Sequence, residues 1–185
     1  MLRTLSDWLY RIANGRVTLA ALVVFLLFVV FVLPAQSLAG GAEADLPVPD
    51  LSFRYSADDL YRMAESYGQE GRAAYVRSHF TFDVAWPLVY LAFLSLAISW
   101  VYGRLSPPGA RLRRVNLMPL AAVLLDLLEN VTTSLVMVRY PARTPGVDLL
   151  ASLSTMAKWI LVAGNVAVLL VGVVALLWKR HRSEG

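Results

Sequence analysis

The 185-residue sequence contains no cysteine and only two histidines, His79 and His181. Without cysteine, the chain can form no disulfide, no thiolate metal site and no cysteine nucleophile. Serine–histidine catalysis is disfavoured as well, because neither histidine lies within a long apolar run. The scarcity of imidazole also argues against a histidine-based metal site. We therefore expect no metal, and the residues leave the cofactor unknown. An oxygen-ligand site for Mg²⁺, Ca²⁺ or Mn²⁺ is possible in kind from Asp83, Asp126, Glu129 and Asn130, but the charge of Lys158 disfavours it.

Charged residues make up only 16% of the sequence, and four long apolar stretches hold few of them: residues 17–33, 80–101, 117–138 and 149–178. A membrane-spanning helix needs about 20 mainly apolar residues, because each residue adds about 1.5 Å towards a hydrocarbon core of about 30 Å. The pattern predicts an all-α polytopic membrane protein. Residues 1–185 are expected to form a single membrane domain, a bundle of four transmembrane helices.

We place these helices at about residues 17–34, 80–102, 117–138 and 149–178. The first of them also resembles a signal peptide, since arginines precede it and small residues follow it. Its apolar run is long for a signal peptide, so we expect a retained transmembrane helix.

Basic residues are unevenly distributed among the connecting segments. Residues 1–16, 103–115 and 179–185 hold ten basic and two acidic residues, whereas residues 34–79 and 139–148 hold six basic and eight acidic ones. Cytoplasmic segments of membrane proteins are enriched in Lys and Arg, so both termini are predicted to be cytoplasmic. We expect a multi-pass protein of the plasma membrane. Topology and lipid contact account for the net charge of +4, and no nucleic acid is needed to explain it.

Residues 35–79 are the only sizeable segment expected outside the membrane, on the extracytoplasmic side between the first two transmembrane helices. Prolines and glycines make its first part an extended linker. The stretch YSADDLYRMAESYG then predicts a short helix, because Ser56 and Asp59 fit a capping box. A second short helix, QEGRAAYVRSHF, is expected to run into the second transmembrane helix, either as a surface helix or as a lid over the bundle.

The third apolar stretch contains LLDLLENVTT, in which Asp126, Glu129 and Asn130 share one helix face. Lys158 in the fourth stretch and Tyr90 in the second lie at a depth comparable to that of Glu129. Counted from the outer helix ends, this depth is about 15 Å, near the midplane. Ionisable residues in spanning helices usually face the protein interior and pair with one another. Asp126 and Glu129 are therefore predicted to meet Lys158.

This predicted cluster has two acids for one lysine. A carboxylate without a partner in a medium of low dielectric constant takes up a proton or attracts another cation. Arg72 or Arg77 of the outer segment, a bound ion or a cationic ligand could supply the second positive charge. Asp83, near the outer end of the second transmembrane helix, is expected to pair with Arg72, Arg77 or His79.

The polar residues run from the outer surface towards the middle of the bundle, so we expect a site that opens to the outside. The predicted ligand-binding residues are Asp83, Tyr90, Asp126, Glu129, Asn130 and Lys158, with Arg72 or Tyr75 near the rim. Asp126, Glu129 and Lys158 are also the candidate catalytic groups, because paired acids beside a lysine permit general acid–base chemistry. The residues are equally compatible with an enzyme and with a binding protein.

Three functions fit this pattern. The first is binding or processing of a lipid-like or amphipathic ligand at the intramembrane site. The second is translocation of protons or cations by a homo-oligomer, because four helices rarely enclose a pathway alone. The third is a structural or assembly subunit, in which the charges only fix the packing of the helices. A lateral opening towards lipid favours the first, a polar pore in an oligomer the second, and a dry, fully paired cluster the third.

Overall fold

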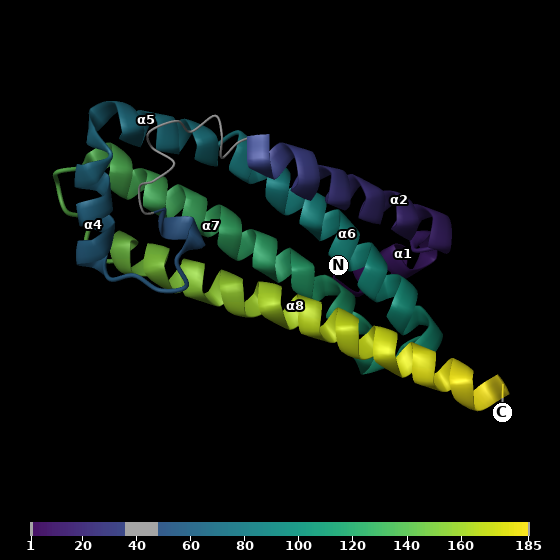
Figure 1. The fold of residues 1–185 in the computed structure, drawn as a ribbon. Coiled ribbons are helices and arrows are strands. Elements are labelled where there is room, and N and C mark those ends of the chain that lie inside the picture. The colour runs from purple at the N-terminus through teal and green to yellow at the C-terminus, as the bar shows by residue number, and fades with distance from the viewer. Residues whose placement is uncertain (1, 36–47, 185) are drawn as a thin grey trace.

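The computed structural model describes residues 2–35 and 48–184. Within these residues the chain is helical and has no strand. Four helical segments are long and apolar enough to cross a membrane: Gly15–Ala35, Gly68–Leu105, Arg111–Arg139 and Val147–Ser183. Figure 1 shows them running side by side along one axis. The prediction of an all-helical chain with four helices of membrane-spanning length and composition is confirmed.

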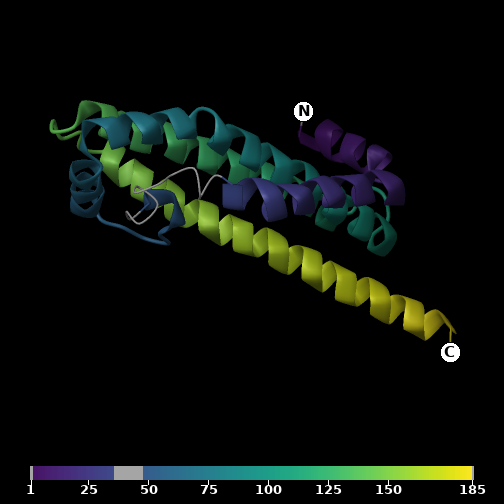
Figure 2. The same ribbon diagram turned by 45° about the horizontal axis from the view of Figure 1, so that its top comes forward.

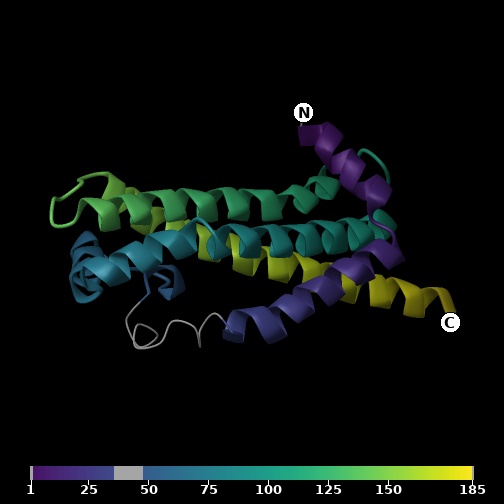
Figure 3. The same ribbon diagram turned by 90° about the horizontal axis from the view of Figure 1, so that it is seen from above.

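The chain begins with α1 (Leu2–Ile12) and α2 (Gly15–Leu27), which meet at an angle at one end of the bundle (Figure 3). Asn14 separates the two helices, and its side chain accepts hydrogen bonds from the first backbone N–H groups of α2. A π-helical turn, η1 (Phe28–Val32), extends α2. No residue of α2 is buried, and Val23, Val24, Leu26 and Leu27 are exposed, as on a lipid-facing helix. Phe25 instead stacks on Trp86 and Phe93 of the neighbouring long helix.

The segment between the first two long helices contains η3 (Pro49–Leu51), α4 (Ala57–Ser66) and α5 (Gly68–His79). The capping box expected at the start of α4 is present: Ser56 N–H donates to Asp59 Oδ2 at 2.8 Å, and Asp59 N–H donates to Ser56 Oγ at 3.2 Å. Hydrogen bonds from Ser56 also hold the pKa of Asp59 below its usual value. Gly68, at a φ of +63°, lets the chain turn from α4 into α5.

The other long helices are α6 (Phe82–Leu105), α7 (Met118–Arg139) and α8 (Val147–Glu184), and the 3-10 helix η4 (Arg111–Leu117) precedes α7. With 38 residues, α8 is about 57 Å long, nearly twice the thickness of a hydrocarbon core. Its C-terminal part projects beyond the other helices (Figure 2). The sequence prediction of residues 149–178 therefore covers only the apolar part of a longer helix.

Two ends of the bundle can be distinguished (Figure 1). At the α1 end, Ser6 Oγ donates to Asn116 Oδ1 at 2.8 Å, which fastens α1 to η4, just before α7. At the α4 end, Leu60 of α4 is buried with Val136 and Met137 of α7. α4 thus closes the end of the bundle opposite the two described chain ends.

Candidate functional site

The charged cluster consists of Asp126 and Glu129 on α7 and Lys158 on α8. Lys158 Nζ lies 3.2 Å from Asp126 Oδ1 and forms an ion pair with Glu129 Oε2. The exposed fractions of the three residues are 8%, 0% and 7%, in that order. Asp126 and Glu129 are three residues apart on one helix, so a single ammonium group reaches both carboxylates. The structure thus brings together the three residues that the sequence places at similar depth.

Each carboxylate of the charged cluster uses its second oxygen to accept a hydrogen bond from a hydroxyl group. Tyr90 donates to Asp126 Oδ2 at 3.0 Å, and Thr155 donates to Glu129 Oε1 at 2.5 Å. The Thr155 hydroxyl lies 3.0 Å from the hydroxyl of Tyr55, which comes from the segment before α4. A continuous line of polar contacts therefore leads from the buried Glu129 to Tyr55.

A second group of ionisable side chains, the Asp–His–Asp group, consists of Asp50 on η3, His79 on α5 and Asp83 on α6. His79 Nε2 lies 2.9 Å from Asp50 Oδ2, and His79 Nδ1 lies 3.2 Å from Asp83 Oδ2. His79 Nδ1 is also 3.0 Å from the carbonyl oxygen of Tyr75, one turn earlier in α5. The expected pairing of Asp83 with one of three cations thus takes place with His79.

Asp50 is fixed by contacts to two helices. Tyr75 OH donates to its Oδ1 at 2.8 Å, and Trp159 Nε1 of α8 donates to its backbone oxygen at 3.0 Å. Burial raises the pKa of Asp50, but the neighbouring His79 and the charge of Lys158 outweigh this effect and hold the pKa below its usual value. Asp50 therefore links the Asp–His–Asp group electrostatically to the charged cluster.

Two predicted site residues have different surroundings. Asn130 Nδ2 donates to the backbone oxygen of Asp83 at 3.0 Å, so it joins α7 to the start of α6. Arg72 donates to the backbone oxygen of Ala64 at 2.9 Å, and its guanidinium lies 4.7 Å from the ring centre of Tyr140. Arg72 thus connects α4, α5 and the end of α7, and these contacts do not involve the charged cluster.

The uneven charge that the sequence indicates is larger in the structure. Four carboxylates, those of Asp50, Asp83, Asp126 and Glu129, gather around one lysine and one histidine. Even with His79 protonated, the formal charges leave two negative charges uncompensated. Such a surplus in a buried region requires protons, water or a bound cation.

A cavity of about 700 Å³, the α4–α8 groove, lies between the start of α4 and the start of α8. Its lining residues are Arg54, Tyr55, Ser56, Ala57 and Asp59 on one side and Leu149, Ser152, Leu153 and Met156 of α8 on the other. The first wall is largely polar and the second mainly aliphatic. Tyr55 belongs to this lining, so the line of contacts from Glu129 ends at the groove.

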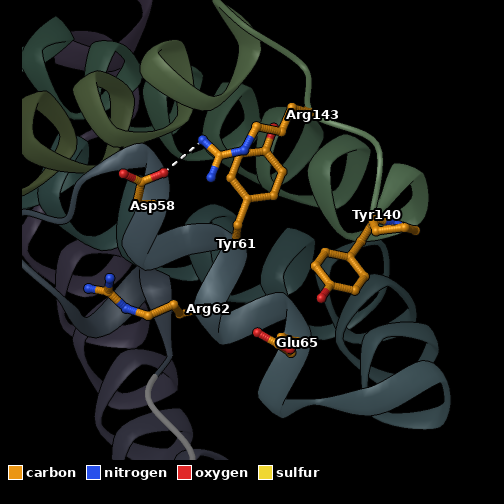
Figure 4. Close-up of a pocket in the computed structure, with 7 residues that line it drawn as sticks. Asp58, Tyr61, Arg62, Glu65, Tyr140 and Arg143 are labelled. Carbon is orange, nitrogen blue, oxygen red and sulfur yellow. Dashed lines mark ion pairs between the residues drawn. The ribbon is translucent and has the colours of Figure 1, made fainter.

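A smaller cavity of about 390 Å³ lies between α4 and the end of α7 (Figure 4). Asp58 and Arg143, two of its lining residues, form an ion pair at 2.7 Å, and Arg143 also lies over the ring of Tyr61. These charged groups compensate one another and leave little for a ligand to neutralise. Neither of the two cavities is lined by Asp126, Glu129 or Lys158.

Four residues of this region are absent from the sequence prediction: Asp50, Tyr55, Thr155 and Trp159. Of these four, Thr155 could most readily have been predicted as a site residue. It precedes Lys158 by three residues on α8 and so lies on the same helix face. Asp50 follows two prolines in the predicted linker, and its contact with Trp159 joins residues 109 positions apart. No local pattern predicts such a contact.

Comparison with known proteins provides no relative from which a function could be transferred: no family model matches the chain, and neither a curated protein nor a solved structure is significantly similar to it. The geometry of the site is therefore the basis for a functional proposal.

Proposed function

We propose that this integral membrane protein binds an amphipathic, lipid-like ligand in the α4–α8 groove, from the extracytoplasmic side. The observation that carries the proposal is the pairing of a polar wall with an aliphatic wall in one groove, connected through Tyr55 and Thr155 to the charged cluster. A headgroup and a hydrocarbon chain need these two surfaces side by side.

The distribution of charge supports access from outside. The basic residues of η4 and of the end of α8 gather at the α1 end, which the positive-inside rule assigns to the cytoplasm. Lys158 precedes Lys179 by 21 residues, or about 32 Å of helix. A hydrocarbon core with Lys179 at its inner edge would have Lys158 near its outer edge. The charged cluster would then lie closer to the outer surface than counting from the outer helix ends indicates.

The lining of the groove suits a lipid-like molecule with an anionic headgroup. Leu149 and Leu153 of α8 are 58% and 47% exposed, as expected for side chains that contact acyl chains. Arg54 on the opposite wall is exposed and forms no ion pair with any residue in the described part of the chain. Its guanidinium is therefore free to bind a phosphate or carboxylate in two-point geometry.

Translocation of protons or cations fits the structure less well. Leu94, Ala122 and Val123 form a buried apolar cluster with Tyr90. This layer lies between the charged cluster and the polar contacts of Asn116 at the α1 end, so it interrupts a path through a single chain. A structural or assembly role, in which the charges only fix the packing of the helices, accounts for the ion pairs. It gives no reason for a groove with one polar and one aliphatic wall.

Lipid analysis of the purified protein tests the proposal. The protein would be extracted in membrane-derived nanodiscs, and its associated lipids would be compared with the bulk membrane by mass spectrometry. Leu153→Trp fills the groove, whereas Leu170→Trp introduces the same side chain at an exposed position of α8 outside the groove.

We expect the wild type and Leu170→Trp to retain one lipid class at severalfold enrichment, and Leu153→Trp to lose this enrichment. Identical lipid profiles for all three proteins and the bulk membrane would overturn the proposal.

A further inference from the structure

We propose that Asp50, His79 and Asp83 bind one divalent transition-metal ion of the Zn²⁺ class. This site is distinct from the α4–α8 groove, and the proposal does not depend on a lipid-like ligand. The three side chains converge from η3, α5 and α6, and one ligand atom from each lies within 4.8 Å of the others. The sequence alone predicts no metal site, because Asp50 falls in the expected linker.

The orientation of the His79 ring carries the argument. Its Nδ1 lies 3.0 Å from the backbone oxygen of Tyr75, a contact that places a proton on Nδ1 and leaves the lone pair on Nε2. The residue is only 2% exposed, so water cannot freely satisfy Nε2. A neutral imidazole held in this way presents its free nitrogen as a metal ligand does.

His79 Nε2 also has an unusual relation to Asp50. Asp50 Oδ2 lies 2.9 Å away, yet Nε2 has no hydrogen-bond partner among the described residues. In a tetrahedral metal site, the bonds from the ion to two ligand atoms form an angle of about 109°. The second ligand atom therefore does not lie on the line from the first ligand atom through the ion. Two electron-rich atoms at this separation are stabilised by a positive charge between them.

The remaining donors fit the same ion. Nitrogen and carboxylate oxygen are common Zn²⁺ ligands, and sites with three protein ligands keep a fourth position for water or substrate. Asp83 Oδ2 lies 3.2 Å from His79 Nδ1, the other nitrogen of the ring, so Asp83 joins the set only if its side chain moves towards Nε2. Asp50 is already oriented by the Tyr75 hydroxyl and the Trp159 ring nitrogen, as metal-bound carboxylates usually are.

The charge of the region is compatible with a cation at this position. Lys158 alone would repel a metal ion, but its ammonium is compensated by Asp126 and Glu129. Among the described residues, the carboxylates of Asp50 and Asp83 form ion pairs only with the histidine. A divalent ion would neutralise both, whereas a proton on His79 would neutralise only one.

Metal titration of the wild-type protein is the first test. The detergent-purified chain would be stripped with EDTA, dialysed and titrated with Zn²⁺ in competition with a chromophoric chelator. Since the chain has no cysteine, thiolate binding cannot contribute. We expect one saturable site per chain, an increase in thermal stability on Zn²⁺ addition, and much weaker binding of Mg²⁺. The absence of a saturable Zn²⁺ site in the wild type would overturn the proposal, as would equal affinity for Mg²⁺.

Variants then locate the site. Asp50→Asn and His79→Gln should each weaken Zn²⁺ binding by more than about 100-fold, and Tyr75→Phe, which releases Asp50 Oδ1, by about tenfold. His181→Gln removes the other histidine and is the matched control, which should bind as the wild type does. A loss in His181→Gln, or unchanged binding in Tyr75→Phe and His79→Gln, would contradict the assignment. Tyr75→Phe keeps all three ligands, so the test remains decisive if a ligand variant fails to fold.

Discussion

The charged cluster makes a quantitative prediction for Lys158→Met. Methionine retains an unbranched, apolar side chain but removes the ammonium group between Asp126 and Glu129. Glu129 is fully buried and Asp126 is only 8% exposed, so neither carboxylate gains hydration in return. Removing one partner of a buried ion pair costs about 3–5 kcal/mol. The hydroxyl groups of Tyr90 and Thr155 remain as donors, so we expect a loss near the lower limit, about 3 kcal/mol.

Equilibrium unfolding in mixed detergent and SDS micelles, followed by the fluorescence of the five tryptophans, measures this loss. Lys179→Met is the matched control, because the other lysine of the chain is exposed on the same helix. It should change the free energy of unfolding by less than about 1 kcal/mol. Adding Glu129→Gln to Lys158→Met should restore more than about 1 kcal/mol, since the buried charge disappears.

Two outcomes would refute this reasoning. If Lys158→Met were no more destabilising than Lys179→Met, the ion pairs would contribute nothing to stability. If the double variant were no more stable than Lys158→Met alone, Glu129 would not be the carboxylate left uncompensated. Asp126→Asn in the Lys158→Met background would then test the other acid.

Two further predictions concern helix packing and topology. A Cβ atom at Gly172 would lie 2.7 Å from a ring carbon of Tyr102, so Gly172→Ala should destabilise the protein by about 1–3 kcal/mol in the same unfolding assay. Gly164→Ala, with 3.6 Å to its nearest neighbour, is the control, and an equal loss there would contradict the packing argument. For topology, an impermeant thiol reagent applied to intact cells should label Glu65→Cys but not Pro108→Cys, and both after lysis. The reverse pattern would invert the proposed orientation.

The part of the site that could be predicted from the sequence lies on long helices. Asp126, Glu129 and Lys158 interrupt apolar stretches, and helix geometry fixes their spacing and approximate depth. An unpaired charge costs free energy in an apolar environment, so the sequence alone predicts that the two acids and the lysine contact one another. The start of α4 was predictable for a similar reason, because the capping box of Ser56 and Asp59 is local in sequence.

The rest depends on contacts that no local pattern specifies. Asp50 lies in a proline-containing stretch without helical periodicity, and its position is set by Tyr75, His79 and Trp159. The full extent of α8 also exceeds the apolar stretch in the sequence, because its first and last turns are more polar than a hydrocarbon-spanning segment. The contacts of Arg72 with Tyr140 and with the carbonyl oxygen of Ala64 likewise follow from no local pattern.

The two proposed sites, the α4–α8 groove and the Asp–His–Asp group, are electrostatically connected. Asp50 interacts with the charge of Lys158, and Lys158 contacts Glu129 at the inner end of the line that leads to the groove. Neutralising Asp50 with a metal ion would release part of the field acting on Lys158. This electrostatic link is one route by which Zn²⁺ binding would influence lipid retention.

An experimental structure of the wild-type protein in lipid nanodiscs tests the central claim most directly. The account predicts elongated density in the α4–α8 groove, with its polar end near Arg54 and Tyr55 and its apolar end along Leu153 and Met156. This density should be stronger and better ordered than that of the lipid around the exposed face of α2. A groove closed by side chains, or occupied only by density like that around α2, would contradict the binding of a specific amphipathic ligand.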